Sequence, residues 1–247
     1  MKKIIIVIVI VSSIIGISAS KIKSQFRPIA VIELFTSQGC SSCPSADRLL
    51  SKTLADSRKN QQAVIALSFH VDYWNRLGWK DPYSEKEYSE RQSSYASTFN
   101  LNSVYTPQVI VNGTKEFVGS NEVQLKAAIG HFLKVNPDAQ FKSISAEVQN
   151  NSPKVKFTLE GNYADCLVNF ALVSLNETTP VKRGENEGEV LMSENIVRQF
   201  ISVPATASGE IDLKPLPLPA INNRAIVAYI QRRNDMKIVG GVMTEIK

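Results

Sequence analysis

The sequence predicts an α/β domain with a helical insertion, followed by an all-β, sandwich-like domain. Two observations predict this order. Apolar runs and helical patterns alternate up to residue 138, whereas from residue 141 onward apolar and polar residues mostly alternate with the period of two typical of strands. The chain has 247 residues, 43% of them hydrophobic, which is long enough for two hydrophobic cores.

The first twenty residues belong to a different kind of segment. Lys2 and Lys3 precede an apolar stretch over residues 4–17, and three small residues follow it. This order is typical of a cleavable signal peptide. An uncleaved anchor is the alternative, but about 14 residues at 1.5 Å each are short for a hydrocarbon core of roughly 30 Å. We therefore expect a signal peptide over residues 1–20 and a periplasmic or secreted protein with no membrane span after cleavage.

The α/β domain, residues 26–138, opens with a strand, a loop and a helix. Residues 29–35 form a short β-branched run typical of a buried strand, and a helix begins near Pro44, where a first-turn proline is tolerated. Residues 63–69 form a second apolar run. The sequence therefore predicts two buried strands connected by a helix.

A helical insertion, residues 71–105, follows the second strand. It holds both tryptophans and five of the seven tyrosines. Ser84 and Glu87 match a capping box at the start of its helix, and aromatic residues then recur near helical spacing. We expect these rings to form the inner face of that helix.

A hairpin and a further helix complete the domain. Asn112-Gly113 is a two-residue turn signal between two short strands, and Ser120 is expected to cap a helix that ends before Pro137. The resulting order is strand, helix, strand, helical insertion, hairpin, helix. This order is a thioredoxin-like topology.

The sandwich-like domain, residues 141–247, has strand patterns bounded by turn residues, at 141–148, 153–161, 166–175, 224–232 and 236–243. A charged excursion is expected over residues 182–199. Cys166 begins one of the strands, and we expect it to be a small buried side chain. Pairing between chains is the alternative for an odd cysteine.

Composition and charge argue against a nucleic-acid-binding protein and against a disulfide scaffold. The formal net charge of +5 includes Lys2 and Lys3, and the remaining excess of basic residues is spread along the chain. Nucleic-acid binding, which needs a basic stripe, therefore has little support. Three cysteines are too few for a disulfide scaffold, so we expect a closely spaced pair to carry chemistry.

The CSSCP string at residues 40–44 is the strongest chemical feature, because it lies where a buried strand meets a helix. Free N–H groups and the positive end of the helix macrodipole stabilise a thiolate there. Cys40 is therefore the expected nucleophile, and Cys43 is the expected resolving thiol. Such a dithiol needs no organic cofactor, and no second CxxC is present to complete a tetrahedral metal site.

Thr106-Pro107 begins the strand that follows the insertion, and the predicted topology brings this strand against the dithiol. A cis peptide bond at Pro107 would hold the neighbouring backbone open for a bound polypeptide. The alternative is a trans proline that begins an edge strand. We expect the cis form, with Pro107 aligning the substrate and Thr106 beside it.

Three strings carry a resemblance to a known family: FTSQGCSSCPSADRLL, FHVDYWNRLGWKDPYSEKEYSERQ and VYTPQVIVNG. They resemble an uncharacterised family of secreted bacterial thioredoxin-like proteins. KRGEN at residues 182–186 and the closing VAYIQ strand extend the resemblance over most of the mature chain. The resemblance implies a thioredoxin-like domain with a redox dithiol and an all-β C-terminal region, and it supplies no substrate. Asn75 stands where an acidic residue is expected.

Several other side chains are candidates for the site. In thioredoxin-like proteins a carboxylate on the strand of Glu33 can take the proton of the resolving thiol; the alternative is a glutamate that reaches solvent. His70 leaves the carboxyl end of a central strand, where it is either an acid-base group or a structural contact of the insertion. Tyr73, Trp74 and Trp79 either wall a groove for a peptide or apolar thiol carrier or anchor the insertion. 

The leading hypothesis is a thiol:disulfide oxidoreductase that acts on protein or small-molecule thiols and disulfides. One alternative is a copper- or zinc-handling protein, because two thiolates from Cys40 and Cys43 with the imidazole of His70 would suit Cu(I). The other alternative is a non-enzymatic binding module in which the two cysteines form a structural disulfide.

Overall fold

The computed structural model describes residues 26–149, 152–215 and 221–246, so the expected signal peptide, residues 1–20, lies outside the described residues. Within these ranges the helices are α1 (Cys43–Lys59), α2 (Lys86–Thr98) and α3 (Glu122–Phe132). The strands are β1 (Ala30–Thr36), β2 (Val64–His70), β3 (Gln108–Val111), β4 (Lys115–Val118), β5 (Ala139–Gln149), β6 (Ser152–Gly161), β7 (Cys166–Pro180), β8 (Val190–Pro204), β9 (Ser208–Asp212), β10 (Arg224–Arg232) and β11 (Ile238–Glu245). Short 3-10 helices occur at Asn75–Leu77 and Ile221–Asn223.

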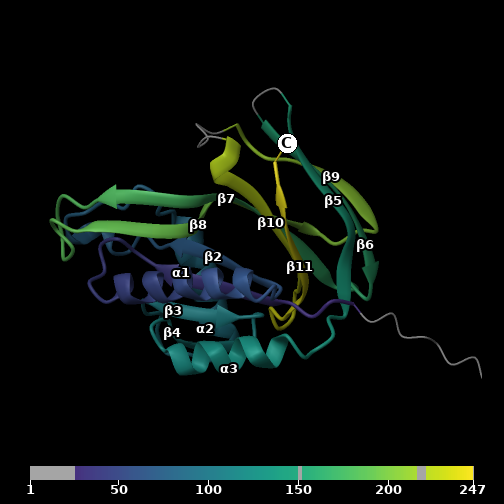
Figure 1. Ribbon diagram of the computed structural model, residues 1–247, viewed down its shortest axis with the longest axis horizontal. Coiled ribbons are helices and arrows are strands. Elements are labelled where there is room, and N and C mark those ends of the chain that lie inside the picture. Colours follow the sequence, from purple (N-terminus) through teal and green to yellow (C-terminus); the bar gives the residue numbers. More distant parts are fainter. Residues whose placement is uncertain (1–25, 150–151, 216–220, 247) are drawn as a thin grey trace, which may run out of the picture.

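The protein is a mixed α/β structure built on two sheets (Figure 1). The large sheet has eight strands in the order β11-β10-β7-β8-β2-β1-β3-β4, and the small sheet has the order β5-β6-β9. No helix among the described residues is long and apolar enough to cross a membrane.

Side chains alternate across the two faces of β1. Ala30, Ile32 and Leu34 pack in one core cluster with α1 and α3, whereas Val31 and Phe35 pack in a second cluster with α2. This alternation is the period-two geometry of a strand buried on both faces. Every residue of β1 is buried, as the apolar run in the sequence predicts.

Each of the two predicted helix caps is wrong by one residue. In α2 the N-cap is Glu85, which makes no side-chain capping bond, and the hydroxyl of Ser84, the predicted cap, donates to the carbonyl oxygen of Asp81. In α3, Asn121 is the N-cap and its side chain accepts a hydrogen bond from the N–H of Gln124. The predicted inner face of α2 is confirmed by the burial of its tyrosines.

The Asn112-Gly113 hairpin turn is confirmed. Asn112 and Gly113 both have positive φ angles, of 48° and 66°, as a type I′ turn requires. A Cβ on Gly113 would lie 1.9 Å from the carbonyl oxygen of Met236, so glycine is needed for space as well. The side chain of Asn112 also accepts from the N–H of Val31 at 2.7 Å and donates to the carbonyl of Ile29 at 3.0 Å.

The expectation of a separate all-β domain needs a correction, because strands from both halves of the chain share the large sheet. β8 pairs with β2 in parallel, with Ser68 opposite Ile196. Side chains strengthen this junction: the hydroxyl of Ser68 donates to the carbonyl of Glu194 at 2.8 Å, and the Asn195 amide donates to the carbonyl of Ala66 at 3.0 Å. The sheet therefore continues from one half of the chain into the other.

The expected charged excursion over residues 182–199 is also wrong in extent. Only residues 181–189 form the connection, and β8 begins at Val190. β9 has no counterpart in the sequence prediction. The sequence pattern does not predict β8. Its pairing with β7 shifts register between Leu172 and Val173, which interrupts the alternation of apolar and polar side chains.

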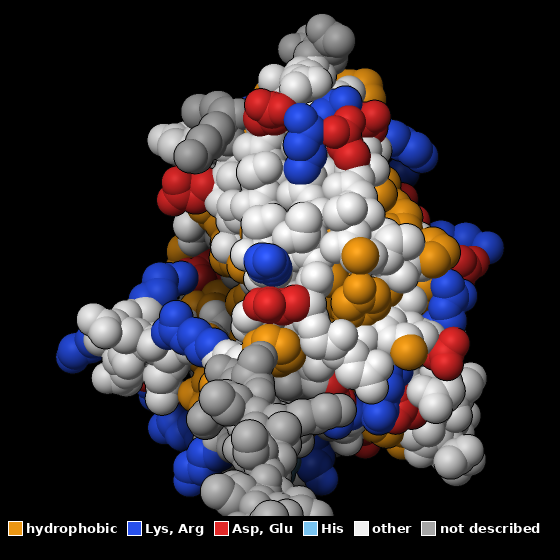
Figure 2. Space-filling model, turned by 90° about the vertical axis from the view of Figure 1, so that its right-hand side faces the viewer, with side chains coloured by type: hydrophobic (Ala, Val, Ile, Leu, Met, Phe, Trp, Pro, Cys, Tyr) orange, Lys and Arg blue, Asp and Glu red, His pale blue; other side chains and the backbone are white. Residues whose placement is uncertain are grey.

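The small sheet packs on β7, β10 and β11, with which it shares one hydrophobic core cluster (Figure 1). Cys166 belongs to this core cluster as a free, 4% exposed thiol, which confirms the prediction of a small buried side chain. The face in Figure 2 shows basic and acidic side chains lying beside one another. In the small sheet, Lys154 of β6 pairs with Glu210 and Asp212 of β9.

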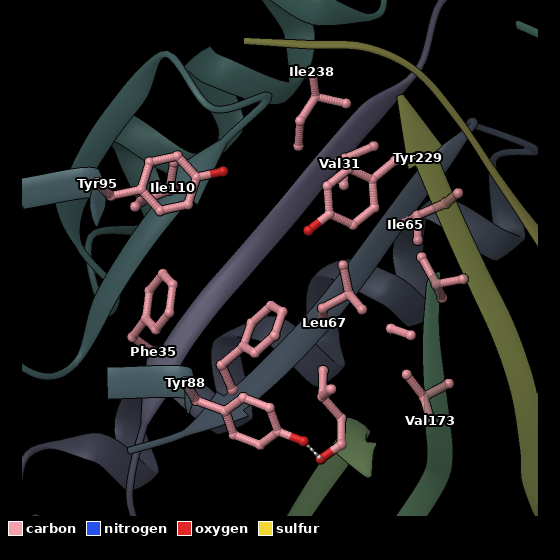
Figure 3. Packing of buried hydrophobic residues seen from close by; sticks show 14 of the residues in the cluster. Val31, Phe35, Ile65, Leu67, Tyr88, Tyr95, Ile110, Val173, Tyr229 and Ile238 are labelled. Carbon is pink, nitrogen blue, oxygen red and sulfur yellow. Dashed lines mark hydrogen bonds between the residues drawn. The ribbon is translucent and has the colours of Figure 1, made fainter. Parts of the chain in front are cut away.

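A buried ion pair joins the two halves of the chain. Glu33 is fully buried on β1, and its carboxylate accepts from Arg91 Nε of α2 at 2.8 Å and from the hydroxyl of Tyr229 of β10 at 2.9 Å. The hydroxyl of Tyr95 also donates to it. Figure 3 shows the Tyr95 and Tyr229 hydroxyls pointing toward one another. The Arg91 guanidinium lies 4.8 to 5.7 Å from the ring centroids of Phe69, Tyr95, Phe200 and Tyr229.

We predict that Arg91→Met lowers the free energy of unfolding by about 3–5 kcal/mol, because it leaves the Glu33 carboxylate buried without its ionic partner. The measurement is chemical denaturation at neutral pH. Lys86→Ala, which removes an exposed pair with Glu90 on the same helix, is the control and should have little effect. The double variant Glu33→Gln/Arg91→Met should recover much of the loss, and a double variant no more stable than Arg91→Met would contradict this account.

Candidate functional site

A disulfide between Cys40 and Cys43 lies where β1 ends and α1 begins. The N–H of Cys40 donates to the carbonyl of Ser37 in a turn, and Cys43 is the first residue of α1 with Pro44 in the first helical turn, as predicted. Both cysteines are fully buried, whereas Ser41 and Ser42 between them are exposed. The disulfide is therefore closed to solvent in this conformation.

Two hydroxyl groups surround the sulfur of Cys40. Thr106 Oγ1 donates to Cys40 Sγ at 3.3 Å, and Ser42 Oγ lies 3.4 Å from the same sulfur. The Thr106–Pro107 peptide bond is cis, as the sequence analysis predicts. The carbonyl of Pro107 accepts from the N–H of Gly119 at 2.8 Å, which holds this turn against the end of β4.

The aromatic side chains of the insertion hold it against the disulfide loop. Trp74 Nε1 donates to Thr106 Oγ1 at 2.8 Å, and Trp79 Nε1 donates to Gln38 Oε1 at 3.2 Å. The hydroxyl of Tyr73 donates to Gln92 Oε1 at 3.2 Å. All three rings are half-buried. These contacts match the anchoring alternative, and contact of these rings with a substrate stays a prediction.

Residues 181–189, which connect β7 to β8 and which we name the clamp loop, cover the disulfide loop. The Asn186 amide donates to the carbonyls of Gln38 and Cys40 at 2.8 and 2.9 Å, and Glu185 Oε2 accepts from the N–H of Ser41 at 2.9 Å. Gly184 has a φ of 81°, and a Cβ there would lie 3.1 Å from Trp79 Cβ. The long β7–β8 hairpin extends toward this end of α1 (Figure 1).

Sequence reasoning missed the role of the clamp loop. Glu185 and Asn186 belong to the KRGEN string at 182–186, which carries part of the family resemblance but suggests no contact by its position. The contacts join residues 144 to 148 positions apart in the sequence, so no local sequence pattern indicates them. The glycine and the asparagine within an otherwise charged string are the available signals of a tight, backbone-binding turn.

Glu33 does not lie on the face of β1 that α1 covers. Its neighbours Val31 and Phe35 pack toward α2, and its carboxylate is held by Arg91, Tyr95 and Tyr229. The expectation of a proton acceptor for Cys43 gains no support from this arrangement. The expectation of a solvent-exposed glutamate is wrong, because the side chain is fully buried.

His70 lies on the α1 face and forms a buried cluster with two aspartates. His70 Nδ1 donates to Asp81 Oδ2 at 2.7 Å, and the same oxygen accepts from the N–H of Gln38 at 2.8 Å. Asp47 of α1 accepts from Thr36 Oγ1 at 3.3 Å. Burial disfavours charge on His70, but Asp81 and Asp47 outweigh it and raise the His70 pKa, and burial raises the pKa of Asp47 to about 6.

The cluster does not extend to the cysteines as a metal site. Among the described residues, no three His, Cys, Asp or Glu side chains are grouped so that they could hold a metal ion. The copper or zinc alternative, with Cys40, Cys43 and His70 as ligands, gains no support from this arrangement.

A family model described as a protein of unknown function, DUF1223, matches residues 31–231. The chain belongs to this family. The matched range includes the disulfide, the clamp loop and strands of both halves of the large sheet. The predicted resemblance to an uncharacterised family is confirmed to this extent.

Solved structures share the family's fold. A crystal structure of a protein from Agrobacterium tumefaciens is 28% identical, has a TM-score of 0.67, and is matched over 87% of this chain and 93% of that chain. HBP35 of Porphyromonas gingivalis is 14% identical with a TM-score of 0.64, over 90% of this chain and 76% of that chain, which is a likeness of fold alone. A search of curated proteins finds no match.

We predict that Asn186→Ala makes the disulfide more reactive, because the substitution removes both hydrogen bonds from the clamp loop to the disulfide loop. Two hydrogen bonds of about 1 kcal/mol each correspond to a roughly 10–30-fold faster reduction by dithiothreitol. Glu187→Ala is the matched control, because Glu187 is exposed in the same loop. An unchanged rate in Asn186→Ala would show that the clamp loop does not restrict access to the sulfurs.

Proposed function

We propose that this protein is a thiol:disulfide oxidoreductase, with a thioredoxin-like domain over residues 26–138 that carries the reactive dithiol. The observation that supports this most is the position of the Cys40–Cys43 disulfide, which spans the last residues before α1 and its first turn. Helix N-termini stabilise thiolates, so this position favours a reversible disulfide.

In this proposal the reduced protein attacks a substrate disulfide through Cys40. The Cys40 thiolate forms a bond to one substrate sulfur, and the other substrate sulfur leaves as a thiolate. Cys43 then attacks Cys40 Sγ, which closes the protein disulfide and releases the second substrate thiol. Two electrons pass from the protein to the substrate, and the reverse sequence oxidises a substrate dithiol. The hydroxyls of Thr106 and Ser42 beside Cys40 Sγ are suited to hydrogen-bond its thiolate.

The substrates in this proposal are protein or small-molecule thiols and disulfides, and the location is the periplasm or the outside of the cell. The signal-peptide pattern over residues 1–20 supports that location. Such compartments permit disulfides to persist. Pro107 and the half-buried rings of Trp74 and Trp79 are the residues expected to line the approach of a substrate.

One observation favours a second candidate function. Both sulfurs are fully buried, which is the usual environment of a structural disulfide in a non-enzymatic binding module. The reduction potential of the Cys40–Cys43 pair, measured by equilibration with glutathione buffers, separates the two. A potential below about −300 mV is typical of structural disulfides, whereas redox-active pairs lie above it.

We predict that Cys43→Ser accumulates mixed disulfides through Cys40, because the attack survives while the resolving step is lost. Cys40→Ser should trap far fewer partners. The measurement is mass spectrometry of each variant after incubation with glutathione disulfide. Equal trapping by the two variants would contradict the assigned roles.

A further inference from the structure

We propose that Asp47, tuned by His70, exchanges the proton of the Cys43 thiol in the resolving step. This inference rests on the proposed oxidoreductase function and deepens it, because it replaces Glu33 as the proton acceptor with residues on the opposite face of β1. Four observations on the described residues carry it.

The register of β1 and β2 places the cluster on the α1 face. Thr36 and His70 are direct partners at the carboxyl ends of these parallel strands. Thr36 lies an even number of residues from Ala30, Ile32 and Leu34, which pack toward α1, and an odd number from Glu33. The hydroxyl of Thr36 reaches Asp47 of α1, which confirms this orientation.

The spacing along α1 places Asp47 near Cys43. The two residues are four apart in the helix, and both are on its buried side. Side chains at i and i+4 are neighbours on one helix face, with Cβ atoms about 5–6 Å apart. A carboxylate one turn after the resolving cysteine can therefore reach its sulfur.

Two buried atoms of the cluster have no partner among the described residues, namely Asp47 Oδ1 and His70 Nε2. Buried polar atoms are normally hydrogen-bonded, so an unpaired one needs an explanation. Cys43 carries no proton while it is in the disulfide. On reduction its S–H becomes a donor, and Asp47 Oδ1 is an unpaired acceptor one helical turn away.

The surrounding charges suit this exchange. Burial raises the pKa of Asp47 to about 6; the charge on His70, the Thr36 hydroxyl and Arg48 lower it, and the Asp81 charge raises it. His70 is faced by Asp81, Asp47, Arg198 of β8 and the ring of Tyr83. A proton acceptor works best when its pKa lies near the working pH, and the pKa of about 6 brings Asp47 closer to neutral pH than an ordinary aspartate.

The step balances in protons and electrons. As Cys43 attacks Cys40 Sγ of the mixed disulfide, its thiol proton passes to Asp47 Oδ1. The Cys40–Cys43 bond forms, and the bond from Cys40 to the substrate sulfur breaks. The substrate leaves as a thiolate and takes a proton from solvent. When the protein disulfide is next reduced, Asp47 returns its proton to Cys43.

The test is a single-turnover reaction of the reduced full chain with one equivalent of 5,5′-dithiobis(2-nitrobenzoate), followed by absorbance between pH 4 and 8. The first release of thionitrobenzoate reports attack by Cys40, and the second reports attack by Cys43. We expect the second rate to rise through an inflection near pH 6. In Asp47→Asn this inflection should disappear, and the second rate at pH 7 should fall about 100-fold. The first rate should change less than about threefold.

Two further variants keep the test decisive. Asp56→Asn, on the exposed side of α1, should match the unmodified protein in both steps. His70→Gln should move the inflection to higher pH, because it removes the positive charge that lowers the pKa of Asp47. If Asp47→Asn does not fold, as judged by circular dichroism, an unmoved inflection in His70→Gln overturns the proposal.

Two outcomes distinguish a failure of the Asp47 role from a failure of the oxidoreductase function. A folded Asp47→Asn variant with an unchanged second step overturns the role of Asp47 and leaves the dithiol chemistry intact. Absence of the first release in the unmodified protein overturns the oxidoreductase function itself.

Discussion

The Glu33–Arg91 ion pair is the interaction on which the arrangement of the two halves depends. It lies between β1, α2 and β10, with both side chains nearly or fully withdrawn from water. Burying such a pair is costly unless further groups saturate it. Tyr95, Tyr229 and Gln231 supply those hydrogen bonds, and four aromatic rings surround the guanidinium, which arginine tolerates better than lysine. The second half of the chain thus supplies hydrogen-bond partners to an ion pair buried in the first half.

The two faces of β1 carry buried polar groups of different kinds. Glu33 faces α2 and is occupied by structural partners, whereas Thr36 faces α1 together with His70 and Asp47. Because side chains alternate along β1, the carboxylate of Glu33 and the carboxylate of Asp47, which contacts Thr36, lie on opposite faces of this strand. A carboxylate that holds a core together is poorly suited to change its protonation during a reaction. Asp47 has fewer partners and is the more suitable group.

Local signals account for the parts of the fold that the sequence predicts. The strand at 29–35, the helix after Cys43 and the Asn112-Gly113 turn each depend on residues close in the chain, and each lies within one residue of its predicted place. The pairing of β8 with β2 and the contacts of Asn186 depend on partners more than a hundred residues away. Side-chain alternation in a short strand also does not show which face a helix will cover, so the environment of Glu33 could not be predicted.

The β7–β8 hairpin connects the large sheet to the loop that covers the disulfide. Its β8 strand extends the sheet from β2, and the loop at its end covers the disulfide through Asn186 and Glu185. Any motion that opens the clamp loop therefore acts on a strand that is continuous with the central sheet. Both cysteines are fully buried beside this loop, so in the proposed redox cycle we expect the clamp loop to move before a substrate reaches Cys40. In the proposed redox cycle the C-terminal half thus limits access to a dithiol that residues 26–138 carry.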